Sequence, residues 1–341
     1  MHGRDPGYIL VAHGSGGKLT GDLFRDLFLP AFRNPYLEQA GDQAVVPLDG
    51  VRLAVTTDSF VVSPLFFPGG DIGRLAVYGT VNDLAVGGAV PVYLTAGFII
   101  EEGLSTEDLR RVVQSMSEAA ARAGVSIIAG DTKVVERGKG DGLFINTTGV
   151  GWVPPGVELG PTRIRPGDRL LVSGPVGDHG AAVMARRAGL DFEVEGLVSD
   201  TAPLAGLVQA LLAAFPGAVR CMRDATRGGL ATVLVELATA SGKAFRVDEA
   251  AIAVREPVRG LCEVLGIDPL YAACEGRMVA VVAADVAEAA VELLRTHPDG
   301  QQAMLIGTVA EGPPGEVLMR TVAGGSRRLE LLEGEQLPRI C

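Results

Sequence analysis

The sequence predicts a mixed α/β protein with two domains. The chain has 341 residues, which is about two domains at roughly 150 residues each. Segments with strand and helix periodicity alternate in both halves. A stretch rich in Pro and Gly, residues 153–168, lacks periodicity and lies between the halves. Hydrophobic residues make up 48% of the chain, enough for two buried cores.

The first half is expected to follow the order β-α-β-α-β-β. Asp71 is the expected cap of its first helix, and Ser105 with Asp108 resembles a capping box before the second, which should end at Gly124. The expected strands are 52–62, 92–100, 125–131 and 143–153, and the expected helices are 72–89 and 106–124.

The second half is also expected to be mixed α/β. Its expected strands are 169–174, 218–223, 277–284 and 303–309, and its expected helices are 180–188, 202–214, 228–241 and 286–296. The closing segment "EGEQLPRIC" has no core-forming pattern. We therefore place the domains at 1–154 and 155–332, followed by a mobile tail at 333–341.

Charge and hydropathy exclude some classes of partner. There are 30 basic and 41 acidic side chains, a net charge of −11, and an acidic surface argues against nucleic-acid binding. No uncharged apolar stretch approaches the roughly 18 residues that a transmembrane helix needs. The N-terminus has too short an apolar run for a signal peptide. We expect a cytoplasmic protein that does not enter a membrane.

The four cysteines form no CxxC pair, so zinc-ribbon and thioredoxin-like sites are not expected. Cys221, Cys262 and Cys274 are interpreted as small buried hydrophobic residues. Cys341 differs because it is the last residue and has polar neighbours. It is either an accident of the chain end or a reactive sulfur.

A glycine-rich loop, "HGSGGK", follows the apolar segment "YILVA". It contains His13, Gly14, Ser15, Gly16 and Gly17. Glycines allow the backbone to approach a phosphate closely. Because Leu follows the lysine, the loop matches neither a Walker A motif nor GxGxxG. A phosphate loop and a plain turn both remain open.

Three aspartates suggest a cation site. Asp58 lies in "TTDS", Asp83 lies in an otherwise almost apolar helix, and Asp131 follows the strand "VSIIAG". A carboxylate in apolar surroundings is costly unless it is paired or bound to metal, and Mg²⁺ bridging to phosphates would explain all three. Alternatively, Asp58 and Asp131 are turn or capping residues; Asp83 is harder to explain in that way.

Other polar residues lie at the ends of predicted elements. Lys133 in "GDTK" is either a stabiliser of developing charge or a solvated lysine, and Glu275 in "CEGRMVAVV" is either catalytic or a loop carboxylate. "RDATRGG" precedes a predicted helix, and helix N-termini favour anions, so a ligand could bind here and approach closely over the glycine pair. Asp224 or Thr226 could instead cap the helix. Ordinary capping is an equal alternative.

Taken together, these segments resemble one family over essentially the whole chain. The motifs that carry the resemblance are "HGSGGK", "TTDSFVVSPLFFPGGDIGRLAVYGTVNDLAVGGAVP", "GFIIEEGL", "GDTKVVERG", "LFINTTGVG", "VSGPVGDHGAA", "RDATRGGL", "EGRMVAV" and the terminal "PRIC". They are similar to the HypE carbamoyl dehydratases of nickel–iron hydrogenase maturation. The internal motifs are shared with an ATP-binding superfamily of aminoimidazole ribonucleotide synthetase, selenophosphate synthetase and thiamine monophosphate kinase. "PRIC" is specific to the hydrogenase branch, and Cys274 replaces an expected asparagine.

The resemblance implies a PurM-like fold, in which an N-terminal β-sheet domain forms a barrel with the same sheet of a homodimer mate and the C-terminal half is an α/β sandwich. It implies that a carbamoyltransferase loads a carboxamide onto Cys341, which the protein dehydrates to a thiocyanate using ATP and Mg²⁺. An iron-scaffold complex of two other maturation proteins would then accept the cyanide. A small-molecule ATP-dependent synthetase or kinase, and a carrier with nucleotide as a switch, are the alternative hypotheses.

The resemblance also assigns roles. Cys341 would carry the substrate, Lys133 would stabilise the oxygen under attack, and Glu275 would be the base. Asp58, Asp83 and Asp131 would bind Mg²⁺. The nucleotide would contact His13, Gly14, Ser15, Gly16, Gly17, Asn82, Asp83, Asp131, Thr132, Asp224, Thr226 and Arg227.

Overall fold

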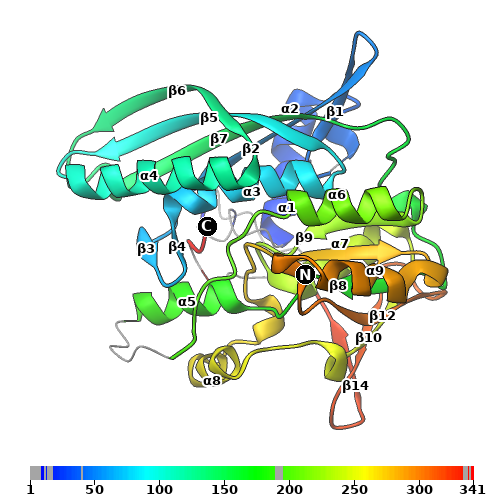
Figure 1. Ribbon diagram of the computed structural model, residues 1–341. Helices are drawn as coiled ribbons and strands as arrows, with labels where there is room; N and C mark the ends of the chain where they lie inside the picture. The colour runs from blue at the N-terminus through cyan, green and yellow to red at the C-terminus, as the bar shows by residue number, and fades with distance from the viewer. Residues whose placement is uncertain are drawn as a thin grey trace.

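The computed structural model describes residues 9–10, 13, 18–39, 41–188, 195–332, 337 and 339–341. These residues form two large sheets, one from each half of the chain, and the expected mixed α/β fold with two domains is confirmed (Figure 1). No helix in these ranges is long and apolar enough to cross a membrane.

The first sheet has the strand order β1-β2-β7-β5-β6. Its strands are β1 (Ala44–Leu48), β2 (Val51–Phe60), β5 (Val90–Glu101), β6 (Ser126–Val135) and β7 (Leu143–Trp152). The other elements of this half are α1 (Lys18–Leu23), the π-helix η2 (Phe24–Phe28), α2 (Leu29–Phe32), the 3-10 helix η3 (Leu37–Gln39), β3 (Phe66–Phe67), β4 (Gly70–Asp71), α3 (Ile72–Val86) and α4 (Thr106–Ala123). The sequence patterns did not predict β1 or the β3–β4 hairpin.

Figure 1 shows α3 and α4 on the side of the first sheet that faces the second half. Asp71 caps α3 as predicted, since its Oδ1 accepts hydrogen bonds from the amides of Gly73 and Arg74. Ser105 likewise caps α4 through the amides of Glu107 and Asp108. Almost all of α3 is buried, because one side packs on the first sheet and its C-terminal end joins the core of the second half.

The second sheet has the strand order β14-β13-β10-β12-β8-β11-β9. Its strands are β8 (Arg169–Val172), β9 (Val219–Asp224), β10 (Ala244–Asp248), β11 (Met278–Val282), β12 (Met304–Ala310), β13 (Val317–Arg320) and β14 (Ser326–Leu329). Its helices are α5 (Asp178–Arg187), α6 (Ala205–Ala214), α7 (Gly229–Ser241), α8 (Glu256–Leu265) and α9 (Ala287–Arg295). Short 3-10 helices are η4 (Pro161–Arg163), η5 (Glu249–Ala251), η6 (Pro269–Tyr271), η7 (Ala284–Val286) and η8 (Pro298–Gly300). The strands β10, β13 and β14 and the helix α8 were not predicted.

The turn before α7 differs from the prediction. The N-cap of α7 is Gly228, at φ 75°, and no side chain caps it, so neither Asp224 nor Thr226 has that role. A Cβ on Gly229 would lie 2.6 Å from two backbone oxygens of the segment 270–272. The glycine pair therefore allows a left-handed turn and close chain packing rather than the approach of a ligand.

The last residues of the chain lie between the two halves (Figure 1). The amide of Val61 donates to the carbonyl of Cys341 at 3.0 Å, and that of Ser63 donates to the carbonyl of Arg339 at 3.3 Å. Ile340 is 3% exposed and packs in the core beside α3. The expectation that this segment lacks core-forming residues was therefore wrong for Ile340; residues 333–336 and 338 lie outside the described residues.

Candidate active site

A cavity of about 260 Å³ lies where β2, α3, β9 and the chain end meet. Its lining is strongly acidic and combines residues from both halves with the C-terminal cysteine. The lining residues are Thr20, Asp42, Asp58, Ser59, Phe60, Gly79, Asp83, Arg223, Asp224, Thr226, Arg227, Val233, Glu236, Glu275 and Cys341. Seven of the predicted site residues therefore meet in one cavity. They are Asp58, Asp83, Asp224, Thr226, Arg227, Glu275 and Cys341.

Three carboxylates converge at one side of this cavity. Asp42, Asp83 and Asp224 each place an oxygen within 4.8 Å of the others. Burial raises the pKa of Asp42 to about 6 and that of Asp224 to about 7. The pKa of Asp83 rises well above its ordinary value, because of burial first and then repulsion from Asp224 and Asp58. The Thr56 hydroxyl donates to Asp83 Oδ2 at 2.9 Å.

This trio fits a divalent cation. Hard cations such as Mg²⁺ prefer carboxylate oxygens, and three carboxylates this close repel one another without a positive charge between them. Asp42 belongs to the trio but was not predicted, because it is an isolated aspartate before β1 with no motif around it. Asp131, which was predicted as a ligand, is not one of the three.

Two arginines face the acids. Arg223 lies 2.7 Å from Asp42 and 3.5 Å from Glu236, so it links β9 to α7 across the cavity wall. Arg227 lies 3.9 Å from Asp58, and burial raises the pKa of Asp58 more than this arginine lowers it. Glu236, an acid among apolar residues in α7, was missed, although the reasoning that found Asp83 applies to it equally.

Cys341 and Glu275 line the same cavity. Burial raises the pKa of the Cys341 thiol to about 12; nearby Arg227 opposes this shift and Glu275 adds to it. Burial, followed by repulsion from Asp224, likewise raises the pKa of Glu275 well above its ordinary value. Glu275 is 2% exposed, and its Oε1 has no hydrogen-bond partner among the described residues. The Cys341 thiol is therefore protonated at neutral pH, and the environment of Glu275 favours its neutral form.

The chain end is held by groups from α5, whose first turn contains the residues Asp178, His179 and Gly180 of "VSGPVGDHGAA". His179 Nε2 donates to the carbonyl of Ile340 at 2.9 Å, and its Nδ1 accepts from Ser199 at 2.8 Å. Burial lowers the pKa of His179 and so favours the neutral ring, and the carbonyl of Ile340, which can only accept, places the proton on Nε2. The Arg187 guanidinium donates to the carbonyl of Arg339 at 2.7 Å. These contacts bind the backbone of the chain end and place its last side chain in the cavity.

Several predicted residues lie elsewhere. Asp131, Thr132 and Lys133 are on β6, at the edge of the first sheet, and the Asp131–Lys133 pair, 2.7 Å apart, is about 70% exposed on each side. None of the three lines the cavity within this chain. β6 is exposed along nearly its whole length.

Two of the residues predicted to contact the nucleotide, Asn82 and His13, do not line the cavity. Asn82 is 1% exposed and bonds to backbone groups of the segment 202–204 and of Glu275 instead of lining the cavity. His13 accepts a hydrogen bond from the amide of Leu10 and does not line the cavity either. Residues 14–17 lie outside the described residues. Thr20, shortly after them, does line the cavity.

Comparison with known proteins gives the relationship. Residues 40–153 match the N-terminal domain of the AIR synthase related proteins, and residues 165–320 match their C-terminal domain. The carbamoyl dehydratase HypE of Azotobacter vinelandii is 55% identical over 335 residues, 98% of each chain.

Solved structures agree with this relationship. The structure of a HypE–HypF complex matches with a TM-score of 0.85 and 47% identity over 91% of this chain and 99% of that one. A HypE structure in complex with ATP matches with a TM-score of 0.82 and 48% identity over 98% of this chain and 100% of that one. The chain, with its PurM-like two-domain fold, belongs to the HypE carbamoyl dehydratase family of the AIR synthase related proteins.

Proposed function

We propose that this protein uses ATP to dehydrate a carboxamide on the sulfur of its own Cys341 to a thiocyanate, the cyanide source for maturation of nickel–iron hydrogenases. The observation that carries the proposal is the position of Cys341, which lines the same cavity as Asp83, Asp224 and Glu275. The names of the relatives as carbamoyl dehydratases agree with it. A free-standing substrate would not need the chain end in this cavity.

The reaction balances without any further oxidant or reductant. The amide oxygen is a poor leaving group, so it first attacks the γ-phosphorus of ATP; an O–P bond forms and the bond to ADP breaks. The C–O bond then breaks with its electron pair and releases phosphate. The nitrogen loses both protons as C≡N forms. Positioning and charge neutralisation provide most of the catalysis in such phosphoryl transfers.

Asp42, Asp83 and Asp224 would hold Mg²⁺, with Asp58 beside them. When bound, the ion would neutralise charge on the phosphates of the nucleotide. The chain's own groups do the rest: Arg227 and Thr226 lie in the cavity lining, where they can orient phosphate oxygens. The loop at Gly14–Gly17 and the preceding His13 remain proposed nucleotide contacts.

Glu275 is the proposed base. A general base works best when its pKa lies near the operating pH, and the pKa of Glu275 is raised from the range of an ordinary carboxylate in that direction. Burial raises this pKa most, followed by the neighbouring acids; divalent cations brought in with the nucleotide would counter the acids and favour ionisation of Glu275. The unpartnered Oε1 is then available for the N–H protons of the carboxamide.

Lys133 can act only if a second subunit provides it. The edge strand β6 exposes apolar side chains, including Ile128 at 59% and Val134 at 66%. Such an edge is a ready surface for pairing with another sheet. We propose a homodimer in which the first sheets of two copies form a barrel, so that Asp131, Thr132 and Lys133 of one copy serve the cavity of the other.

The remaining assignments follow from the family. We propose residues 1–154 as the ATP-binding and dimerisation domain, 155–332 as the second domain, and 333–341 as a tail that moves between the cavity and partner proteins. A carbamoyltransferase such as HypF, which forms a solved complex with a HypE, would load Cys341. An iron-scaffold complex of two other maturation proteins would accept the cyanide, in the cytoplasm.

Intact-mass spectrometry tests the proposal. The protein is carbamoylated on Cys341 with cyanate and then mixed with Mg-ATP, and a Cys341→Ser protein serves as the control. Loss of one water from the C-terminal peptide together with ADP formation is expected. If ATP is consumed while the mass of this peptide stays constant, the dehydratase proposal is wrong and a synthetase or kinase with a free substrate replaces it. If the carbamoylated peptide and ATP both stay unchanged, the carrier reading is favoured.

A further inference from the structure

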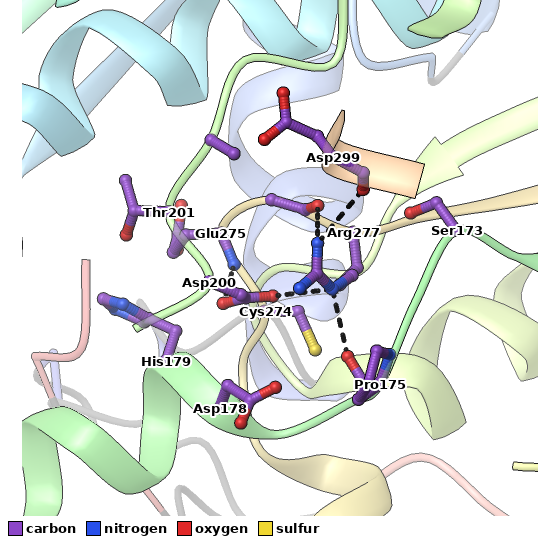
Figure 2. Close-up of polar contacts among 12 residues, drawn as sticks. Ser173, Pro175, Asp178, His179, Asp200, Thr201, Cys274, Glu275, Arg277 and Asp299 are labelled. Atoms are coloured by element: carbon purple, nitrogen blue, oxygen red, sulfur yellow. Dashed lines mark hydrogen bonds and ion pairs between the residues drawn. The ribbon is translucent and has the colours of Figure 1, made fainter. Parts of the chain in front are cut away.

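The residues that follow Glu275 in "EGR", Gly276 and Arg277, have no role in the chemistry above, yet both are held tightly. A Cβ on Gly276 would lie 2.0 Å from the carbonyl oxygen of Asp200, so only glycine fits where these two segments touch. Arg277 donates to the carbonyls of Pro175 and Gly276 and lies 3.6 Å from Asp200 (Figure 2). The segment around Glu275 is therefore pressed against the segment around Asp200.

Side chains bind both backbone polar groups of Glu275. Its amide donates to Asp200 Oδ1 at 3.1 Å, and its carbonyl accepts from Asn82 Nδ2 at 3.3 Å. Asn82 also joins the two segments, because its amide nitrogen donates to the carbonyl of Ala202 at 3.0 Å and its Oδ1 accepts from Leu204 at 2.7 Å. Figure 2 shows Asp200 between Arg277 and the backbone nitrogen of Glu275.

We propose that Asp200 and Asn82 are positioning residues that clamp the backbone of Glu275 and so aim its side chain at the sulfur of Cys341. This inference deepens the proposed function, since it rests on Glu275 as the base. The clamp is built from both halves of the chain: Asn82 comes from α3, beside the cavity residue Asp83, and Asp200 precedes α6. It thus sets the position of the base relative to the acid cluster.

The structure makes a purely structural role a weaker explanation. Asp200 is buried and its second oxygen, Oδ2, has no hydrogen bond within the described residues, with Arg277 only nearby. A carboxylate buried in this incomplete way costs stability. A role in holding the backbone of Glu275 in place explains why a carboxylate with this cost lies at the amide of Glu275.

Asp168 provides a matched control. It is 4% exposed, accepts the amide of Arg165 at 2.8 Å and lies 3.5 Å from Arg220. It therefore has the same contacts as Asp200, a backbone amide and an arginine, but its amide belongs to Arg165, which does not line the cavity, whereas Glu275 does. Any loss shared by Asp168→Ala and Asp200→Ala is structural.

The experiment measures single-turnover dehydration of carbamoylated Cys341 at saturating Mg-ATP, with thermal unfolding and ATP binding measured for every variant. Asp200→Ala is expected to slow dehydration by about 10- to 100-fold, because small displacements of a reacting group have effects of this size. ATP affinity should stay unchanged. Asp200→Asn, which keeps an acceptor oxygen for the amide, should recover most of the rate, and Asp168→Ala should retain the wild-type rate.

A double-mutant comparison tests whether Asp200 acts on the rate through Glu275. Glu275→Ala should be slow, and adding Asp200→Ala to it should slow it no further, because the clamp has nothing left to aim. Asn82→Ala tests the carbonyl side independently and covers the case in which one variant does not fold. If Glu275→Ala dehydrates at the wild-type rate, the proposed function of Glu275 is wrong. If Glu275→Ala is slow but Asp200→Ala and Asn82→Ala match Asp168→Ala, only the clamp is refuted.

Discussion

Arg187→Ala is expected to release the chain end from the cavity and to expose the thiol of Cys341. Arg187 donates to the carbonyl of Arg339 at 2.7 Å and also holds the carbonyl of Ser63. A hydrogen bond from a charged donor contributes about 1.5–3 kcal/mol. Losing it should increase the undocked fraction of the tail by about 10- to 100-fold, and the alkylation rate should rise by the same factor.

The pH dependence of alkylation gives a sharper signature. The thiol pKa is about 12 in the cavity but about 8.5 in water, so the docked state holds the proton more tightly. Because docking raises the pKa of the thiol, the protonated thiol stabilises the docked tail. This stabilisation is complete below the pKa of the free thiol and is lost as the pH rises from there toward 12. The difference amounts to at most about 5 kcal/mol. Above pH ~8.5 the undocked fraction should therefore grow about tenfold per pH unit.

Alkylation by iodoacetamide, followed by mass spectrometry of the C-terminal peptide, measures both effects. The wild-type rate should continue to rise above pH ~9, whereas a released tail should level off near the pKa of a free thiol, about 8.5. Arg186→Ala, which removes an exposed arginine from the same helix, is the control and should behave as wild type. A wild-type profile that levels off near pH ~9, or equal rates for Arg187→Ala and wild type, would refute a docked thiol.

Asp83→Asn removes one carboxylate of the repelling trio, so without divalent cations the free energy of unfolding should rise by about 1 kcal/mol, and Mg²⁺ should no longer raise the melting temperature. Calorimetry with and without Mg²⁺ measures both effects. An undiminished effect of Mg²⁺ would argue against the trio as the metal site. Lys133→Ala and Cys341→Ser proteins should each be inactive alone but regain turnover after subunit exchange, because the Lys133→Ala subunit keeps its substrate sulfur and receives a lysine from its mate; no recovery would mean that Lys133 does not act across the interface. Gly229→Ala should lose about 2 kcal/mol or more in urea denaturation, since its Cβ meets backbone oxygens at 2.6 Å, whereas Gly242→Ala, at φ 66° with open space around it, should lose less; equal losses would contradict the packing argument.

The sequence predicted most helices and central strands because their patterns are local. Asp71 and Ser105 are caps whose partners lie within three residues, and both were predicted correctly. The strand β1 was missed because its burial depends on pairing with β2. The short strand β10 was missed for a similar reason, since it lies between β12 and β13, which follow it in sequence.

The site was predictable where a residue conflicts with its surroundings. Asp83 conflicts with the apolar helix around it, and the structure places it in the acid cluster. Asp42 has no such conflict, and only the tertiary fold brings it to the cluster. Asn82 shows the opposite case. The resemblance assigned it a nucleotide contact, but one residue along a helix from Asp83 is about 100° away, and its side chain binds the segment 202–204.

The charges in the cavity imply how the nucleotide enters. Six acidic side chains and two arginine side chains line it, so full ionisation of these side chains would leave four uncompensated negative charges in a partly buried space. The raised pKa values of Asp42, Asp83, Asp224 and Glu275 show that protons relieve part of this repulsion. A bare triphosphate would add to the repulsion, so the cavity favours a nucleotide that carries divalent cations with it. Such cations would also counter the repulsion from Asp224 and Asp58, which, after burial, raises the pKa of Glu275.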